Sequence, residues 1–206
     1  MDRKTHWEQV YTTKEPNSVS WFQEHAEQSL RLIHATDLGT TAAIIDIGGG
    51  ASTLVDDLVA ESYRDITVLD LSAAALAAAR QRNGNRAQDI EWIEGDITEV
   101  QLPASRFDIW HDRAVFHFLT EADSRRRYIQ QVLQAVRPGG YIIIATFAED
   151  GPEKCSGLPV MRYSPLTLHA EFGDGFKLLT HEKEAHSTPF GTTQQFIYCY
   201  CRLDGA

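Results

Sequence analysis

IIDIGGGAS, residues 44–52, is the stretch that decides the fold of this chain. It reads as a short apolar strand, an acid at Asp46, three glycines and a serine. Glycine permits a sharp strand-to-helix turn and lets a ligand approach the backbone, because it has no Cβ. Ser52 can cap the helix that follows, whose free N–H groups would face a ligand above the loop. The stretch is typical of the first βα turn of a nucleotide-binding α/β sheet, although other tight turns also use glycine.

Further apolar segments follow this loop and alternate with helical patterns. Apolar strands are predicted over 66–70, 90–93, 107–112 and 141–147. Helical spacing of apolar residues predicts helices over 20–35, 52–61, 72–83, 121–136 and 165–172. Because the strands are continuously apolar, they predict a parallel sheet with helices on both faces. A terminal strand pair is expected over 176–179 and 195–201, where Cys199 and Cys201 should share one face.

Composition narrows the class of protein and its partners. The chain has 206 residues, 43% of them hydrophobic, which predicts one globular domain. A formal net charge of −10 argues against a nucleic-acid partner. The sequence has no long apolar span and no signal-peptide pattern, so we expect a cytoplasmic protein that does not bind a membrane. Three cysteines without metal-type spacing predict neither a disulfide framework nor a metal site.

Acids at or just beyond the ends of four predicted strands combine with the glycine loop into one pattern. They are Asp46, Asp70, Asp96 and Asp112. Over residues 40–147 the order and intervals of these motifs resemble the class I S-adenosylmethionine-dependent methyltransferases. In that family the loop reads acid-x-Gly-x-Gly-x-Gly, and here Ser52 replaces the third glycine. The Arg137-Pro138-Gly139-Gly140 segment is similar to the family's Pro-Gly-Gly before its fifth strand.

The resemblance implies a fold and a cofactor. The fold is a Rossmann-like three-layer αβα sandwich with a seven-stranded, mostly parallel sheet in the order 3-2-1-4-5-7-6 and an antiparallel last strand. The cofactor is S-adenosyl-L-methionine, which leaves as S-adenosyl-L-homocysteine. The cofactor-binding residues that it implies are Asp46, Gly48, Gly49, Gly50, Ser52, Asp70, Leu71, Asp96, Ile97, Asp112, Trp7, Tyr11 and Trp21.

Several of these residues have a chemical reason to bind such a cofactor. Asp70 follows Gly48 by 22 residues, a spacing that suits a bidentate contact with ribose hydroxyls. Asp96 can accept a hydrogen bond from an adenine amino group, and Ile97 offers a backbone N–H beside it. Aromatic rings near acids favour a cationic sulfonium, and the candidates for such a lid are Trp7, Tyr11 and Trp21. The alternative is an N-terminal helix that merely packs on the sheet.

The segment after the fourth strand holds the candidate catalytic residues. They are Asp112, Arg113, His111 and His117. A sulfonium-bound methyl is already activated, so a general base is needed only if the nucleophile arrives protonated. Asp112 and Arg113 would lie beside the methionine part of the cofactor, or else form an ion pair at the sheet edge. Each histidine is either a base or a structural hydrogen-bonding residue.

Within a single methyltransferase domain over 1–206, residues 1–40 are expected to form a cap segment and 148–172 an acceptor-site loop and helix. Long loops after a strand are often functional. Cys155 could contact the acceptor, a soft nucleophile such as sulfide could be the substrate class, or the thiol has no chemical role. Arg162 and Tyr163 could hold an anionic acceptor.

The predicted function is methyl transfer to an unidentified acceptor, with a small molecule as the first choice. A protein lysine is the alternative, because Trp7-x-x-x-Tyr11 and Trp21-Phe22 are similar to elongation factor lysine methyltransferases. Against it, Arg113-Ala114 stands where that subgroup has lysine-glycine. An NAD(P)-dependent oxidoreductase would share the glycine turn, but the chain has no Tyr-x-x-x-Lys pair of the short-chain type. A non-catalytic cofactor-binding protein is the remaining alternative.

Overall fold

Seven strands form the central sheet of the computed structural model, which describes residues 2–205. They are β1 (Ala43–Ile47), β2 (Asp65–Asp70), β3 (Glu91–Glu94), β4 (Phe107–Arg113), β5 (Val136–Phe147), β8 (Phe176–Ser187) and β9 (Thr193–Leu203). Their order is β3-β2-β1-β4-β5-β9-β8, with β1 to β5 parallel and β9 antiparallel to both β5 and β8. The predicted order is confirmed, because β8 and β9 are the sixth and seventh strands of this sheet along the chain.

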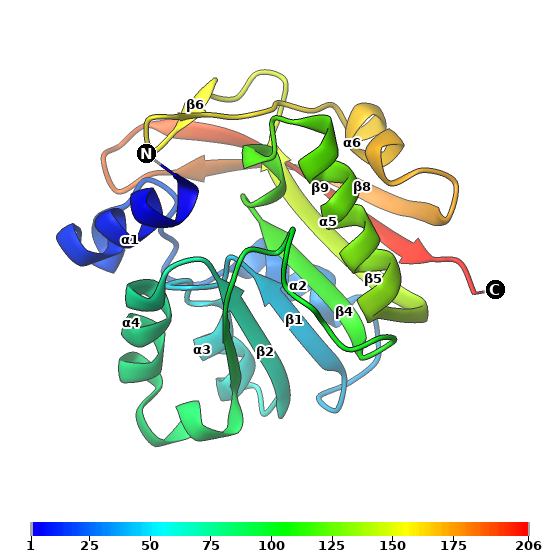
Figure 1. Cartoon of the computed structure of the whole chain (residues 1–206), viewed down its shortest axis with the longest axis horizontal. Coiled ribbons are helices and arrows are strands. Elements are labelled where there is room, and N and C mark those ends of the chain that lie inside the picture. The colour runs from blue at the N-terminus through cyan, green and yellow to red at the C-terminus, as the bar shows by residue number, and fades with distance from the viewer. Residues whose placement is uncertain (1, 206) are drawn as a thin grey trace.

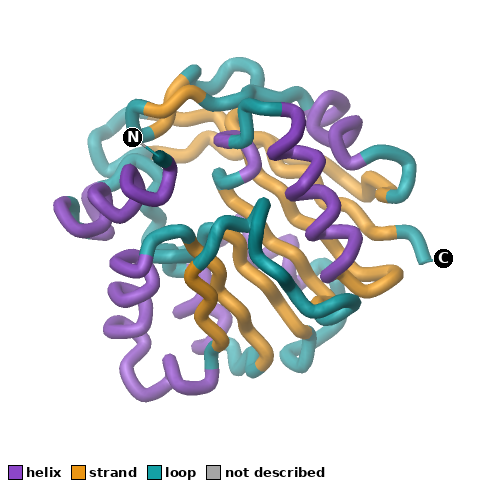
Figure 2. Tube along the Cα trace, in the orientation of Figure 1, coloured by secondary structure: helices purple, strands orange, loops and turns teal. Residues whose placement is uncertain are grey.

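Helices cover both faces of the sheet, as Figure 2 shows. On one face lie α2 (Glu27–His34), α3 (Leu54–Ala60) and α4 (Ala73–Asn83). On the other lie α5 (Ala122–Ala135) and α6 (Pro165–Phe172). Ser72 caps α4 through a hydrogen bond that its side chain accepts from the Ala75 N–H. The predicted three-layer αβα sandwich is therefore confirmed.

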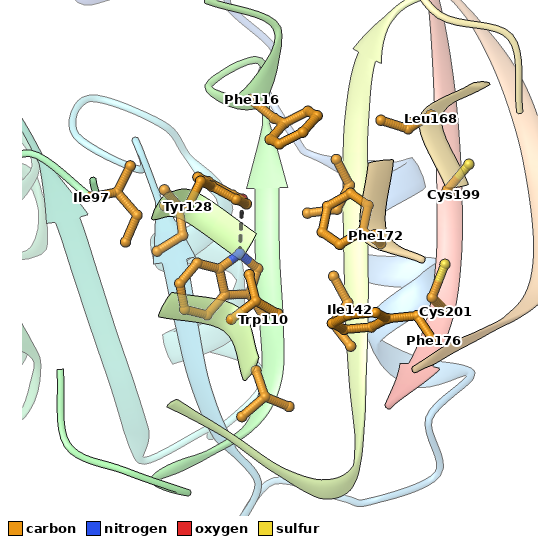
Figure 3. Close-up of a cluster of buried hydrophobic side chains, with 14 of the residues drawn as sticks. Ile97, Trp110, Phe116, Tyr128, Ile142, Leu168, Phe172, Phe176, Cys199 and Cys201 are labelled. Carbon is orange, nitrogen blue, oxygen red and sulfur yellow. Dashed lines mark hydrogen bonds between the residues drawn. The ribbon is translucent and has the colours of Figure 1, made fainter. Parts of the chain in front are cut away.

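The core under α5 and α6 is rich in aromatic side chains (Figure 3). Trp110 donates a hydrogen bond from Nε1 to the Tyr128 hydroxyl at 2.9 Å, so the polar atom of each buried ring has a partner. Burial of each large apolar side chain contributes about 1.5–3 kcal/mol. Cys199 and Cys201 both lie in this core, as their spacing predicted, and neither forms a disulfide.

Three segments differ from the sequence-based expectation, and one is the strand predicted over 176–179, which continues as β8 to Ser187. The helix predicted over 20–35 begins only at Glu27, because the backbone before it bonds to the α3 region. There the Gln23 carbonyl accepts from the Thr53 hydroxyl at 3.0 Å, and the Ala26 N–H donates to Asp57 at 3.3 Å. The loop after β5 contains a small hairpin of β6 (Lys154–Cys155) and β7 (Leu158–Pro159).

The N-terminal helix α1 (Arg3–Thr13) packs beside α4, near the carboxyl ends of the parallel strands (Figure 1). Its first turn is capped by Asp2, whose side chain accepts a hydrogen bond from the Thr5 N–H at 3.0 Å. Among residues 2–205, no helix has the length and apolar character needed to cross a membrane.

Candidate functional site

A cleft, here called the main cleft, lies between α1 and the carboxyl ends of β1, β2 and β4. It encloses about 750 Å³ of empty space when its open mouth is included. The structure brings ten of the predicted site residues to its wall. They are Trp7, Tyr11, Trp21, Gly48, Asp70, Leu71, Asp96, Ile97, Arg113 and Cys155.

A second, smaller pocket adjoins the main cleft beside the glycine loop, and we call it the glycine-loop pocket. The two spaces share wall residues, which are Tyr11, Trp21, Ile47, Gly48 and Arg113. Four further predicted residues line only the smaller pocket, namely Asp46, Gly49, Ser52 and His111. A ligand that extends along the glycine loop can therefore occupy both spaces.

The three glycines of the loop pack directly against other site residues. Gly48 has a φ of +68°, and a Cβ added there would clash with Val115. A Cβ on Gly49 would clash with the Asp46 carboxylate, and one on Gly50 with the Asp70 carboxylate. Any side chain in the loop would displace one of the two acids or their neighbour, so the loop forms a narrow backbone cradle, in which Gly48 and Gly49 line a pocket and Gly50 lines neither pocket.

Ser52 does not cap the following helix in the predicted way. The helix α3 begins at Leu54, and its N-cap position is taken by Thr53 without a side-chain hydrogen bond. The Ser52 hydroxyl instead accepts from the Leu54 N–H at 3.2 Å, just before the helix. The residue still lies at the edge of the glycine-loop pocket.

Asp70 ends β2 at the wall of the main cleft. Its Oδ1 accepts a hydrogen bond from the Ser72 N–H at 2.8 Å. Burial, helped by the negative charges of Asp46 and Glu8, raises the pKa of this carboxyl to about 7, against the lowering effect of the hydrogen bond from the Ser72 N–H. The side chain is thus an acceptor at the position expected for ribose, and its charge changes near neutral pH.

Asp96 lies farther along the main cleft, after β3, and its carboxylate is already partly engaged. Oδ1 accepts from the Thr98 N–H at 2.8 Å and from the Thr98 hydroxyl at 2.7 Å. Oδ2 accepts from the Arg3 guanidinium at 3.0 Å. Since a carboxylate oxygen offers two lone pairs, Oδ2 can accept one more hydrogen bond.

Arg3 is a site residue that sequence reasoning missed. It precedes Trp7 and Tyr11 by four and eight residues on α1, and side chains at this spacing lie on one helix face. All three line the main cleft. The spacing is the signal that could have identified Arg3 from the sequence.

Polar contacts and ring packing hold α1 over the main cleft. Glu8 accepts hydrogen bonds from the Ser72 hydroxyl at 2.7 Å and from the Ala74 N–H at 3.3 Å, at the start of α4. The Trp7 ring centroid lies 5.5 Å from that of Trp21 and 5.1 Å from that of Phe118. The aromatic residues proposed as a lid therefore meet above the cleft, together with Phe118, which the sequence did not single out.

Asp46 and His111 form a buried pair between the glycine loop and α2. The two residues are register partners on β1 and β4, and His111 Nδ1 lies 2.7 Å from Asp46 Oδ1. His111 Nε2 lies 2.8 Å from the Ser29 hydroxyl, so both ring nitrogens are engaged. Asp46 is 2% exposed, and its Oδ2 has no hydrogen-bond partner among residues 2–205. An acceptor without a partner thus remains at the glycine-loop pocket.

Asp112 points to the opposite face of the sheet and lines neither pocket. Its carboxylate accepts from the Val115 N–H at 2.8 Å, the Phe116 N–H at 3.0 Å and the Tyr128 hydroxyl at 2.6 Å. Burial raises the pKa of this carboxyl to about 6. The expectation that it lies beside the cofactor is not met, because successive side chains of a strand point to opposite faces.

Arg113 does lie at the junction of the two pockets, held by β8, β9 and the N-terminal segment. It is 10% exposed and donates hydrogen bonds to the Tyr198 hydroxyl at 3.0 Å, the Trp21 carbonyl at 3.2 Å and Glu184 at 3.3 Å. Its guanidinium carbon lies 4.3 Å from the centroid of the Phe196 ring. The side chain is fixed in position, and Glu184 balances its charge.

The other candidates lie outside both pockets. His117 is buried, its Nδ1 accepts from the Phe147 N–H at 3.2 Å, and burial lowers its pKa to about 3, which keeps the ring neutral. Arg162 is exposed and donates to the Gly151 carbonyl at 3.2 Å. Tyr163 is buried against the Phe116 ring. The structure therefore does not place these three side chains at an acceptor.

Comparison with known proteins agrees with this geometry. Residues 44–140 match the family model described as a methyltransferase domain. A curated relative, the eEF1A lysine and N-terminal methyltransferase homolog of Drosophila pseudoobscura pseudoobscura, is 23% identical over 154 residues. The match covers 70% of this chain and 22% of the relative. This chain spans about a fifth of the length of the first such relatives.

Two solved structures share the fold over almost the whole chain. One, described as the conversion of a disulfide bond into a thioacetal group during echinomycin biosynthesis, has a TM-score of 0.80 at 19% identity. The match covers 98% of this chain and 93% of the chain in that structure. The other is the N-methyltransferase NodS from Bradyrhizobium japonicum WM9 in complex with S-adenosyl-l-homocysteine. It has a TM-score of 0.74 at 16% identity and covers 98% and 99% of the two chains.

Residues 44–140 therefore match the methyltransferase domain family model, and the chain has the Rossmann-like methyltransferase fold. The predicted resemblance to methyltransferases is found, and the NodS structure holds S-adenosyl-l-homocysteine, the product of the predicted cofactor S-adenosylmethionine. The predicted similarity to elongation factor lysine methyltransferases is also found. The site fits this cofactor, because it combines a backbone cradle with an unpartnered carboxylate oxygen on Asp46.

Proposed function

We propose that this chain transfers the methyl group of S-adenosylmethionine to a nucleophile on a small-molecule acceptor. The observation that carries the proposal is the main cleft, where a strand-end carboxylate and a group of aromatic rings share one covered space. When bound there, the cofactor supplies a methyl group activated by a positively charged sulfur. The protein then has to bind and orient the acceptor behind this methyl group and exclude water from the site.

Three acids are proposed to hold the cofactor, each by a different part. Asp70 accepts hydrogen bonds from the ribose hydroxyls, and the free lone pair of Asp96 accepts one from the adenine amino group, beside the Ile97 N–H. Asp46 Oδ2 accepts from the ammonium group of the methionine part. His111 positions Asp46, because it occupies Oδ1 and leaves Oδ2 directed to the ligand.

Aromatic side chains are proposed to close the site over the sulfonium. Trp7, Tyr11 and Trp21 form its cover, and the Trp21 Nε1–H donates to the Tyr11 hydroxyl at 3.2 Å, which fixes the relative position of two of the rings. The faces of aromatic rings attract cations, and the nearby acids make the cleft more favourable for positive charge. Arg113 is proposed to position this cover through its bond to the Trp21 carbonyl.

The contact of α1 with the β6–β7 hairpin at one end of the main cleft supports a small acceptor. α1 meets the β6–β7 hairpin, where His6 Nε2 lies 3.3 Å from the Ser156 hydroxyl. Cys155, at 4% exposure, closes the same end of the main cleft. The neighbour from echinomycin biosynthesis is described as acting on a disulfide, which is chemistry at sulfur. A protein lysine remains the second candidate, favoured by the Drosophila relative.

The domain organisation and location are part of the same proposal. We propose a single methyltransferase domain over 1–206, with 1–40 as the cap; within the predicted acceptor segment 148–172, Cys155 on the β6–β7 hairpin is the residue that lines the main cleft. All three cysteines are free, which supports a reducing compartment such as the cytoplasm. The net charge of −10 supports an acceptor other than nucleic acid.

The test is methyl-label transfer by the purified chain, applied separately to metabolite pools and to extract proteins, with calorimetry of S-adenosylmethionine binding. Label in the metabolite pool supports the small-molecule acceptor. Label only in protein favours the lysine alternative. Failure to bind the cofactor would overturn the proposal, and binding without any transfer would favour a non-catalytic protein.

A further inference from the structure

The main cleft has an acceptor end, which we define by Trp7, Trp21, Arg113, Phe118 and Cys155. These residues line the same cleft as Asp70 and Asp96, whose carboxylates are proposed to be occupied by the nucleoside. The Trp7 ring contacts the other two rings edge-on, and the thiol lies on the hairpin that meets α1. The acceptor end is therefore a wall of ring faces and edges with one sulfur atom in it.

Several side chains at or near the acceptor end are of types that can act as a general base. Each is held in a protonation state or a hydrogen bond that prevents it from taking a proton from an acceptor. Burial raises the pKa of the Cys155 thiol to about 12, so it stays protonated. Burial also raises the pKa of the neighbouring Tyr11 hydroxyl, which stays neutral. Arg113 carries a permanent positive charge, and His111 has both nitrogens engaged in the glycine-loop pocket. Within residues 2–205, the acceptor end thus offers no general base at neutral pH.

An acceptor bound at this end must therefore arrive already able to attack. A hydroxyl or an ammonium group must first lose a proton, whereas a thiol with a pKa of about 8.5 is a few per cent thiolate at pH 7 and strongly nucleophilic. A carboxylate is also ionised, but it loses its hydration against an apolar wall. Sulfur is polarizable and makes favourable contacts with aromatic rings.

Arg113 adds an electrostatic contribution in the same direction. Its positive charge acts to lower the pKa of the Cys155 thiol, although burial outweighs it there. An acceptor thiol at the same end experiences this charge too, reduced by Glu184, which accepts a hydrogen bond from the guanidinium at 3.3 Å. Arg113, which three hydrogen bonds hold in place, therefore favours the ionised form of the acceptor.

We propose, resting on the proposed function, that the acceptor is a sulfur nucleophile: a hydrosulfide or small organic thiolate bound against the rings of Trp7, Trp21 and Phe118. The thiol releases its proton to water before the transfer. Its sulfur lone pair forms the new S–CH₃ bond while the methyl–sulfonium bond breaks, and that electron pair stays on the cofactor sulfur. The products are a methyl thioether, or methanethiol from hydrosulfide, and S-adenosylhomocysteine.

The experiment compares acceptors that differ only in the attacking atom. Binding of S-adenosylmethionine is first measured by calorimetry, and formation of S-adenosylhomocysteine is then followed with thiophenol, aniline, phenol and benzoate, and separately with hydrosulfide. We expect kcat/KM for thiophenol or hydrosulfide to exceed the other values by about 100-fold or more. The two sulfur arms distinguish an organic from an inorganic acceptor. At saturating cofactor, the pH profile should follow the pKa of the thiol supplied and shift when another thiol is used.

Each contrary result has a distinct meaning. Faster turnover of aniline, phenol or benzoate would overturn the sulfur assignment and leave methyl transfer intact. Cofactor binding with no turnover of any of these acceptors would also overturn it. A chain that does not bind the cofactor would refute the proposed function itself.

A variant tests the ring wall directly. Phe118→Ala should raise the KM for thiophenol by about three- to tenfold, because one sulfur–aromatic contact is lost, with the cofactor Kd unchanged. If the Phe118→Ala variant does not fold, Phe118→Leu replaces it, because leucine keeps most of the side-chain volume without the ring. Phe118→Leu should also raise the KM for thiophenol. Phe190→Ala is the matched control, since Phe190 is 65% exposed on the hairpin between β8 and β9. An unchanged KM in a folded Phe118 variant would contradict the proposed contact.

Discussion

The two ends of the main cleft are built in different ways. The proposed nucleoside end contains the glycine loop, Asp70 and Asp96, which follow the first three strands in turn, and backbone N–H groups donate hydrogen bonds to both acids. The acceptor end is formed by α1, the segment around Trp21, the end of β4 and the β6–β7 hairpin. The contact between His6 on α1 and Ser156 on the hairpin joins residues that lie 150 positions apart in the sequence. A local motif therefore identifies the cofactor, while selection of the acceptor depends on distant segments that meet only after folding.

The largest effect on cofactor affinity should come from the nucleoside end. Asp70→Ala removes the acceptor for the ribose hydroxyls, so we expect S-adenosylmethionine binding to weaken by more than about tenfold in calorimetry. Glu99→Ala, at an exposed position near the same edge, is the control. An unchanged isotherm for Asp70→Ala would refute the ribose assignment.

Affinity for S-adenosylmethionine should depend on pH through the Asp70 carboxyl. Because burial raises the pKa of Asp70 to about 7, its accepting, ionised form is depleted as the pH falls through 7. Affinity for S-adenosylmethionine should therefore be about tenfold weaker at pH 6 than at pH 8, in proportion to the ionised fraction. The Asp70→Asn variant should show a flat profile over this range. Equal affinity of the wild type at both pH values would exclude this titration.

A smaller effect is expected where the two ends are joined by α1. Arg3→Ala removes a partly exposed ion pair with Asp96, and such pairs are worth about 0.2–1 kcal/mol, so cofactor affinity should fall about two- to fivefold. The loss should shrink at high salt. Arg126→Ala, which breaks an exposed pair with Asp123, should leave binding unchanged. Tighter binding by Arg3→Ala would mean that Arg3 competes with adenine for Asp96.

The smallest change in affinity should come from Asp112, although its sequence position resembles that of the other strand-end acids. Asp112→Ala should alter the cofactor Kd by less than about threefold but lower the free energy of unfolding by more than about 2 kcal/mol, because three donors, two of them buried, lose their acceptor. Urea unfolding and calorimetry measure both quantities. A loss of affinity as large as that of Asp70→Ala would return Asp112 to the cofactor site.

Much of the fold and the nucleoside end could be predicted from the sequence, because their signals are local. Continuous apolar strands with strand-end acids indicated the sheet, and the glycine loop indicated the cradle. The position of Asp112 could also have been predicted, because side chains alternate along β4 and Asp112 therefore lies on the face opposite to that of Arg113. The start of α2 was not, because the backbone before it bonds to Thr53 and Asp57 from another element.

The acceptor end was predicted only in part for a related reason. Trp7, Trp21 and Cys155 were candidates, but their meeting with Phe118 depends on how three segments pack, which no local spacing encodes. Arg162 and Tyr163 were expected beside the acceptor because they belong to the same loop as Cys155. The loop instead turns at the β6–β7 hairpin, so Arg162 bonds to Gly151 at the surface and Tyr163 enters the core.

The placement of α1 has a practical consequence for anyone who produces this protein. Asp2 starts the helix and Arg3 already reaches Asp96, so a purification tag fused ahead of them would emerge at the mouth of the cleft. The other end of the chain lies on the opposite side of the view in Figure 1, past β9. An affinity handle for binding assays therefore belongs after Gly205, where it leaves ligand entry unhindered.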